Sequence, residues 1–458
     1  MPNLITDWRP EDPDFWEAKG KSIALRNLWI SVPALLLAFI VWQLWSVATV
    51  YMPNVGFKYT PGQLMVLTAL PALSGATLRI FYAFIVPVTG GRRWTVISTF
   101  SLLIPSIWLG IAIQDLSTPF YVMAIIALLC GFGCANFSSS MANIGYFFPP
   151  HKKGMATGTN AGLGNLGVSV IQFVTPFIIS VSIFGALGGA PQHWVHGSLS
   201  KSLWLQNIGY VWVPFLVISI VAAYFGMNDL ATAKASFSGQ AIIFKRRDNW
   251  LLCLLYLGAF GSFIGFSAAL PLLIKREFPL QDPLTYAFIG PLLGSIFRVV
   301  GGSLSDKISP AKITQWSFIL IIVSVLSIMY WLPSGDGTGN FIGFLLSFLV
   351  LFVFVGLANG SIFAQVPVVF LKFHKKLSPQ DHETALHNMR KESGTVLGFM
   401  GAIGAYGGFI IPQLNALSIQ HTGSLTIAFS FFISYYVLCT IVNKWFYNRN
   451  KTSLSDLH

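Results

Sequence analysis

The sequence predicts an all-α integral membrane protein, with twelve transmembrane helices arranged as two six-helix halves. Three observations support this fold class. Hydrophobic residues make up 54% of the chain and charged residues only 10%, which lies far outside the range of soluble proteins. Apolar runs long enough to cross a bilayer recur along the chain, and the second half repeats features of the first. We therefore expect the chain to be embedded in a membrane.

About 20 helical residues cross the roughly 30 Å of hydrocarbon in a bilayer. Apolar runs of this length lie near residues 29–52, 64–88, 95–113, 119–148, 155–187, 204–226, 249–274, 284–304, 311–332, 340–371, 393–417 and 422–447. The expected organisation is a cytoplasmic N-terminal segment (1–28), an N-terminal six-helix half (29–226), a polar and basic cytoplasmic linker (227–248), a C-terminal six-helix half (249–447) and a cytoplasmic tail (448–458).

The positions of Lys and Arg predict the orientation, because cytoplasmic loops collect positive charge. Of the 28 basic residues, the odd-numbered loops hold only Lys58, Lys201, Lys275 and Arg276. Both termini are therefore expected in the cytoplasm, in a multi-pass protein. The net charge of +12 is dispersed over short loops, which indicates membrane lipid as a partner and no nucleic acid.

The sequence contains no motif that is typical of a catalytic or metal site. The four cysteines fall in predicted helices, without the His or carboxylate neighbours of a metal site, and are interpreted as packing residues. No nucleophile motif or phosphate-binding loop is found. We therefore predict no cofactor, no metal and no enzymatic activity. The N-terminal residues are too polar for a cleaved signal peptide.

An internal repeat links the two halves. The segment "PALSGATLRIFYAFIVPVTGGRRW" (71–94) is similar to "GPLLGSIFRVVGGSLSDKISPAK" (290–312): each has a Gly four residues before an Arg, then an apolar stretch and a short basic loop. Duplicated halves are typical of transporters. Two six-helix halves related in this way have the architecture of the major facilitator superfamily. A bundle-type channel is the main structural alternative.

The equivalent arginines of the repeat are Arg79 and Arg298. Each lies roughly nine or ten residues, about 13–15 Å, from its cytoplasmic helix end. A charge at this depth is costly and needs a counter-charge or a function, and the predicted spans contain no Asp, Glu or His within them. The arginines could snorkel or bond to helix carbonyls. We favour anion binding, because the guanidinium stays charged and donates parallel hydrogen bonds to a small oxyanion.

The absence of Asp, Glu and His from the predicted spans also favours one transport mechanism over another. Proton-coupled carriers usually hold a titrating group in the membrane. Two cationic groups repel one another when no anion is bound, and they come together around a bound anion. This behaviour favours anion exchange over proton coupling. Proton-coupled symport through Tyr or a backbone relay stays open, as does a channel or a carrier of another small inorganic or organic anion.

Several longer motifs resemble one transporter family. They are "TALPALSGATLRIFYAFIVPVTGGRRW" (68–94), "GFGCANFSSSMANIGYFFP" (131–149), "GTNAGLGNLGVSVIQ" (158–172), "LYLGAFGSFIGFSA" (255–268) and "GFMGAIGAYGGFIIP" (398–412). These segments resemble the NarK-like nitrate/nitrite porters of the major facilitator superfamily. The resemblance covers nearly the whole chain. It implies nitrate and nitrite as transported anions, antiport by alternating access, a bacterial inner membrane, and a monomer.

The resemblance also implies a binding site. Arg79 and Arg298 would clamp the anion at the interface of the halves, and Phe137 and Phe363 would sandwich it. Asn165 and Tyr256 would add hydrogen bonds; this completes a substrate site of six residues. For the two phenylalanines the alternative is ordinary helix packing, and for Asn165 and Tyr256 it is interhelical hydrogen bonding.

Glycines recur at spacings that give small-residue helix faces, where backbones approach closely. The glycines expected to take part in conformational change are Gly158, Gly162, Gly164, Gly167, Gly398, Gly404 and Gly408. Static packing is the alternative. One departure from the family pattern is Ala364 directly after Phe363, with Gln365 one residue further. The preference for nitrate or nitrite and the direction of exchange are left open by this departure.

Overall fold

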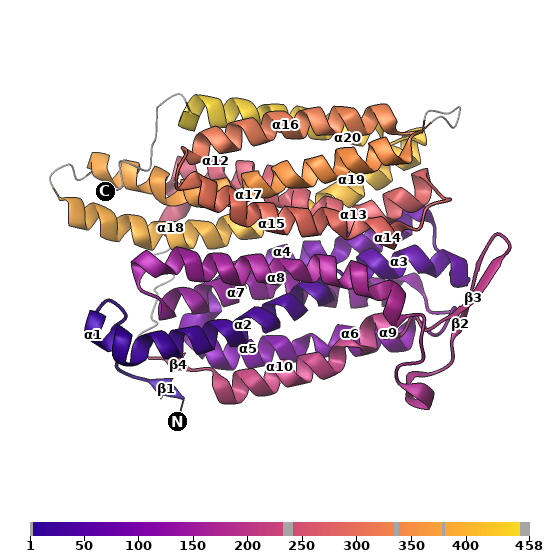
Figure 1. Ribbon diagram of the computed structural model, residues 1–458, viewed down its shortest axis with the longest axis horizontal. Helices are drawn as coiled ribbons and strands as arrows, with labels where there is room; N and C mark the ends of the chain where they lie inside the picture. Colours follow the sequence, from indigo (N-terminus) through magenta and orange to yellow (C-terminus); the bar gives the residue numbers. More distant parts are fainter. Residues whose placement is uncertain (1–2, 232–240, 334–338, 378–380, 449–458) are drawn as a thin grey trace. The chain divides into compact units, whose positions relative to one another are not determined.

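The computed structural model describes residues 3–231, 241–333, 339–377 and 381–448 (Figure 1). Within these ranges, twelve helical stretches are long and apolar enough to cross a membrane, which confirms the predicted all-α membrane fold. Two short sheets accompany the helices. Strands β1 (Leu4–Ile5) and β4 (Asp229–Leu230) pair in parallel, and β2 (Gln192–His196) and β3 (Leu199–Leu203) form an antiparallel hairpin.

The helices follow the predicted order. Those before residue 232 are α1 (Pro13–Phe15), η1 (Trp16–Gly20), α2 (Lys21–Trp42), α3 (Leu44–Val55), α4 (Pro61–Thr89), α5 (Gly91–Ser101), α6 (Leu103–Ala112), α7 (Phe120–Phe147), α8 (Pro150–Ile178), η2 (Gly185–Gly188), α9 (Asn207–Tyr210) and α10 (Trp212–Gly226). Those after residue 240 are η3 (Ala241–Lys245), α12 (Arg247–Tyr256), η4 (Leu257–Gly261), α13 (Ser262–Glu277), α14 (Pro283–Ala287), α15 (Ile289–Ser305), α16 (Pro310–Trp331), α17 (Phe341–Leu377), α18 (His382–Ala405), α19 (Gly407–Thr422), α20 (Thr426–Asn443) and η5 (Lys444–Asn448).

Several helices extend beyond their predicted ends, α18 among them, which begins at His382 rather than at 393. The first begins at Pro13, because the Asp12 carboxylate caps its free N–H groups and proline is well suited to the first helical position. Helix α17 continues to Leu377, since basic side chains in a last turn are favoured by the helix dipole although they lower hydropathy. His374, which lies beyond the predicted run 340–371, is therefore part of α17 and buried.

Several of the spans are interrupted. Backbone breaks at Gln43, Leu102 and Tyr406 separate α2 from α3, α5 from α6, and α18 from α19. Between α12 and α13 the chain forms a wide π-helical turn, η4, directly after Tyr256. Such turns often lie at functional sites, because the extra residue re-aims the neighbouring side chains.

The chain divides into two compact units. Unit 1 comprises residues 1–235 and 267–288, and unit 2 comprises residues 236–266 and 289–458. The division falls within α13, so the last part of this helix belongs to unit 1. There the Gln172 amide donates to the Ser267 carbonyl (2.8 Å), and the Lys275 ammonium donates to Asn54 Oδ1. Contacts of this kind fix residues 267–288 on α3 and α8.

In unit 1, α4 packs along α7 through glycines. A Cβ added to Gly75 would lie 2.2 Å from the Cβ of Cys134 and 2.7 Å from the Gly131 carbonyl oxygen. The Ser74 hydroxyl donates to the Leu128 carbonyl at 2.6 Å across the same contact. Only residues without side chains allow backbones this close. The contact brings Arg79, one turn further along α4, against the backbone of α7.

Unit 2 repeats this packing between α15 and α17. A Cβ on Gly356 would lie 2.5 Å from the Gly294 carbonyl oxygen, and one on Gly360 would lie 2.1 Å from the Arg298 carbonyl oxygen. Gly301 faces the backbone of Leu357 in the same way, at 2.4 Å. The glycine four residues before each arginine, noted in the sequence, is therefore a helix-packing residue in both units.

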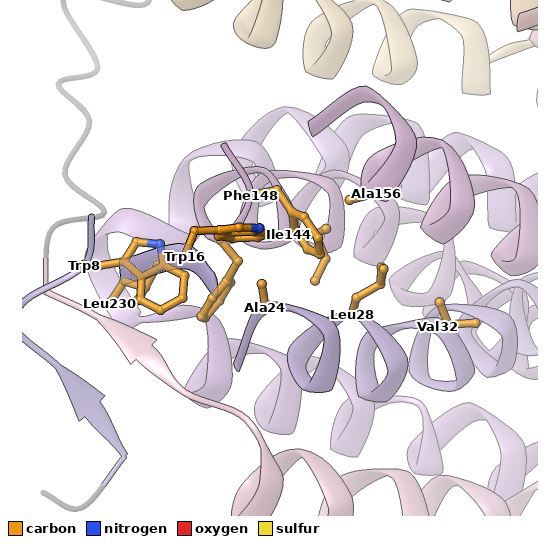
Figure 2. Close-up of a cluster of buried hydrophobic side chains, with 10 residues drawn as sticks. Trp8, Trp16, Ala24, Leu28, Val32, Ile144, Phe148, Ala156 and Leu230 are labelled. Carbon is orange, nitrogen blue, oxygen red and sulfur yellow. The ribbon is translucent and has the colours of Figure 1, made fainter. Parts of the chain in front are cut away.

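The N-terminal segment is part of the folded unit 1. Trp8 and Trp16 pack with Phe148 and Leu230 in a hydrophobic cluster that also contains α2 residues (Figure 2). Strand β1 pairs with β4, where the buried Asp229 carboxylate accepts from the backbone N–H of Arg92 at 2.8 Å and pairs with its guanidinium. These contacts fix the start of α2, the start of α5 and the end of α10 relative to one another.

The adjacent glycines of α15 give a matched test of this packing. We expect Gly301→Ala to destabilise the protein by about 1–3 kcal/mol, because backbone atoms of Leu357 cannot move aside cheaply. The control is Gly302→Ala, since a Cβ at Gly302 meets nothing within 4 Å and alanine favours the helix. Thermal unfolding in detergent, followed by tryptophan fluorescence, measures both. Equal melting temperatures for the two variants would contradict the close α15–α17 packing.

Candidate functional site

Arg79 is held by α7 and by the end of α2. It is fully buried, and its Nε donates to the carbonyl oxygen of Cys134 at 2.8 Å. Its guanidinium carbon lies 4.7 Å from the ring centroid of Phe137 and 5.3 Å from that of Trp42. A guanidinium over an aromatic face is stabilised by the negative face of the ring. Two rings and one carbonyl therefore compensate this charge where water is excluded.

Arg298 has a similar environment in unit 2. It is 6% exposed, and its guanidinium carbon lies 4.9 Å from the ring centroid of Phe363 and 5.8 Å from that of Phe260. Phe363 comes from α17, the helix whose glycines pack against α15. Each arginine thus lies over a phenylalanine from its glycine-packed partner helix. The structure brings Arg79 together with Phe137, and Arg298 together with Phe363.

Tyr256 belongs to the same aromatic group as Arg298. Its ring centroid lies 5.1 Å from that of Phe363, and it stacks on Phe260 at 5.4 Å with an interplanar angle of 10°. The π-helical turn η4, which follows Tyr256, allows Tyr256 and Phe260 to stack in this way. The structure therefore gathers Tyr256, Phe260, Phe363 and Arg298 in unit 2.

Asn165 lies on α8 of unit 1 and is fully buried. Neither atom of its side-chain amide has a hydrogen-bond partner among the described residues. A buried amide in this condition costs free energy unless a water or ligand satisfies it.

Three residues of these surroundings were missed in the sequence analysis. Trp42 and Phe260 face the arginines, and Asn359, on α17, lies one turn before Phe363 and therefore on the same helix face. Asn359 is 1% exposed, and both atoms of its amide lack partners within the described ranges. The only sequence signal for Asn359 was a polar residue in an apolar helix; Trp42 and Phe260 gave none among so many aromatic residues.

The predicted conformational glycines differ in their surroundings. Gly164, Gly167 and Gly404 lie in close contacts, against Leu35, the Leu36 carbonyl oxygen and the Tyr256 ring respectively. A Cβ on Gly158, in contrast, would meet nothing within 4 Å. Gly162 and Gly408 are buried in α8 and α19, and Gly398 is half-buried in α18. Gly164, Gly167 and Gly404 therefore lie where the helices pack closely.

A buried ionic cluster lies elsewhere in unit 2. Arg246 makes a bidentate pair with Glu392, at 2.8 and 3.0 Å, and Nε2 of His374 lies 3.5 Å from the same carboxylate. Glu392 and His374 are 6% and 4% exposed. This cluster joins the start of α12 to α17 and α18. Among the described residues, no group of three or more His, Cys, Asp or Glu side chains could hold a metal ion.

Comparison with solved structures agrees with this architecture. The crystal structure of the D-xylose-proton symporter covers 93% of this chain and 98% of its own, with a TM-score of 0.67 and 14% identity. A mutant form of the nucleoside transporter NupG covers 91% of this chain and 99% of its own, with a TM-score of 0.59 and 13% identity. At such low identity these likenesses establish the fold alone.

Comparison with known sequences is more specific. The family model of the Major Facilitator Superfamily matches residues 34–412. The nitrate/nitrite transporter NarU of Escherichia coli (strain K12) is 48% identical over 98% of this chain and 97% of its own length. The probable nitrate/nitrite antiporter NarK2 of Thermus thermophilus is 39% identical over 97% and 96%. The chain is therefore a transporter rather than an enzyme, and it belongs to the NarK-like nitrate/nitrite porter family of the Major Facilitator Superfamily.

Proposed function

We propose that this protein transports nitrate and nitrite, and that it exchanges one for the other. The relatives that support this proposal are named as nitrate/nitrite transporters or antiporters and align over nearly the whole chain. The observation that carries it is the pair of buried arginines, each placed over a phenylalanine in its own unit. A small, flat, singly charged oxyanion suits such groups best.

The chemistry of the arginines favours binding of a planar oxyanion. A guanidinium donates two parallel hydrogen bonds to two oxygen atoms of one anion, and it stays charged at any physiological pH. In a site without water these bonds are stronger than at an exposed surface. We propose that Arg79 and Arg298 both donate to the transported anion.

The aromatic residues have two roles in this proposal. Phe137 and Phe363 support the guanidinium groups, and their flat faces exclude water and bulky anions. Trp42 and Phe260 complete the aromatic surroundings. Asn165, Asn359 and Tyr256 then supply polar contacts, and the unsatisfied amides of the two asparagines are suited to donate to anion oxygens.

Exchange is favoured because binding of an anion relieves the desolvation cost of a buried cation. The loaded carrier then rearranges more easily than the empty one. We propose that the two six-helix halves alternate in this movement and that the glycine-rich faces of α8, α18 and α19 take part in it. If the carrier without an anion reorients slowly, net transport in one direction is slow and exchange of one anion for another dominates.

Proton-coupled uptake is the second candidate function, and one observation favours it. His374 and Glu392 are buried groups in contact, on the parts of α17 and α18 that lie beyond the predicted apolar runs. An imidazole and a carboxylate can each bind a proton, which makes such a pair a candidate for a proton carrier. We rank this candidate second because the relatives NarK1 and NarK2 of Thermus thermophilus are named probable antiporters.

The proposed setting is a bacterial inner membrane with both termini in the cytoplasm. The twelve candidate spans and the bacterial relatives support it, together with the distribution of Lys and Arg. An even number of spans returns the chain to the side on which it began. We propose a monomer as the transporting unit.

Arg79→Lys and Arg298→Lys test the guanidinium contacts. Each variant should lower nitrate uptake into proteoliposomes by about 10- to 100-fold, because a point charge replaces a planar pair of donors. The control is Arg9→Lys, at a side chain that is 58% exposed. Uptake close to that of the unmodified protein in either lysine variant, at equal incorporation, would exclude the proposed role.

Phe137→Ala and Phe363→Ala test the aromatic walls. Both variants should raise KM for nitrate and admit bulkier anions such as chlorate, because loss of the ring removes cation–π support and opens space beside the guanidinium. Phe225→Ala, at a 74% exposed ring, is the control. Competition of unlabelled anions with labelled nitrate measures selectivity. If both variants keep the original ranking of anions, the phenylalanines only pack helices.

The two candidate modes differ in what drives uptake. With internal nitrite present, labelled nitrate should enter several-fold faster than into empty vesicles, and a pH gradient at clamped voltage should have no effect. The His374→Gln variant should then exchange normally. Concentrative uptake driven by a pH gradient alone, and lost in His374→Gln, would overturn exchange in favour of proton coupling.

A further inference from the structure

A basic cavity lies at the start of α12, apart from the arginine site. Its volume is about 340 Å³. Lys245, Arg246 and Arg247 line it from η3 and α12, and Phe370 and Phe373 line it from the end of α17. All of these residues belong to unit 2. The cavity thus combines cationic groups with an apolar wall.

The cations of this cavity are incompletely neutralised. Arg246 is paired with Glu392 and lies over the Phe373 ring at 4.4 Å. Lys245 and Arg247 make no ion pair with any residue in the described ranges, and Arg247 contacts the Phe446 ring instead. Asp248, also in the lining, accepts a hydrogen bond from the Tyr447 hydroxyl at 3.0 Å.

The position of these cations makes them unfavourable without an anion. They stand at the N-terminal end of α12, where the helix dipole is positive and basic side chains are disfavoured. The same end of a helix, together with cationic side chains, stabilises a phosphate group. Arg246 is already paired with Glu392, so an anion in the cavity would mainly neutralise Lys245 and Arg247.

Exposed apolar side chains lie close in sequence to the residues that line the cavity. Phe244 is 39% exposed and Trp250 is 49% exposed, and both contact Phe399, at 5.0 and 5.6 Å between ring centroids. Ile242, on the same short helix η3, is 40% exposed. Exposed aromatic residues beside basic residues are typical of the level of the lipid head groups in a membrane.

We propose that this cavity binds the phosphate group of an anionic phospholipid. Lys245 and Arg247 contact the phosphate, and the acyl chains lie along Ile242, Phe244 and Trp250. Inorganic phosphate shares the chemistry of the head group, but it would leave the apolar rim uncovered. Since none of these residues surrounds Arg79 or Arg298, the inference is independent of the transported anion.

Lipid retention in native mass spectrometry tests the proposal. The protein, purified in mild detergent, is mixed with phosphatidylglycerol or with phosphatidylcholine of the same acyl chains. Phosphatidylglycerol should bind several-fold more tightly, and the double variant Lys245→Gln/Arg247→Gln should weaken its binding by about 30-fold. The single variant Lys245→Gln, at an exposed side chain, should weaken it about fivefold and keeps the test valid if the double variant does not fold.

The matched control removes the same charge elsewhere in unit 2. Lys307→Gln/Lys312→Gln, at exposed positions just after α15 and in the first turn of α16, should leave phosphatidylglycerol binding unchanged. Equal binding of the two lipids, or equal losses in the test and control variants, would overturn the proposal. Displacement of the lipid by millimolar inorganic phosphate would show that the cavity takes a free anion instead.

Discussion

The stabilisation of two guanidinium groups away from water is the constraint on which the rest of the structure depends. An isolated charge in hydrocarbon costs several kcal/mol at least. The protein meets this cost with the quadrupoles of aromatic rings and, at Arg79, with the carbonyl oxygen of Cys134. A guanidinium that is supported by aromatic rings keeps its charge and can still attract an anion.

The packing of the helices follows from this requirement. Arg79 reaches the backbone of α7 because Gly75 and Gly131 have no side chains and let α4 and α7 pack closely. Gly356 and Gly360 give α15 and α17 the same proximity around Arg298. The rings of Phe137 and Phe363 come from those partner helices. In each unit, close backbone packing and cation–π support are therefore parts of one arrangement.

Buried ion pairs lie away from Arg79 and Arg298, where helices of the same unit meet. The buried pair His374 and Glu392 lies where α17 and α18 meet the start of α12, and it is linked through Arg246 to the basic cavity. Asp229 makes a comparable buried pair with Arg92 in unit 1. Both pairs join neighbouring elements of the same unit, and so contribute to cohesion within it.

The sequence by itself determined the membrane fold and the number of spans, because hydropathy over about 20 residues is a local property. It also identified Arg79 and Arg298 as candidate anion-binding residues, because a charge in the middle of an apolar run is visible without the fold. Its resemblance to the porters added Phe137, Phe363, Asn165 and Tyr256. Only the tertiary structure decided that Trp42 and Phe260 face the arginines, since ring contacts depend on how distant helices pack. It also decided that α17 continues past residue 371 and buries His374, because burial at a helix end comes from neighbouring helices rather than from the hydropathy of the segment.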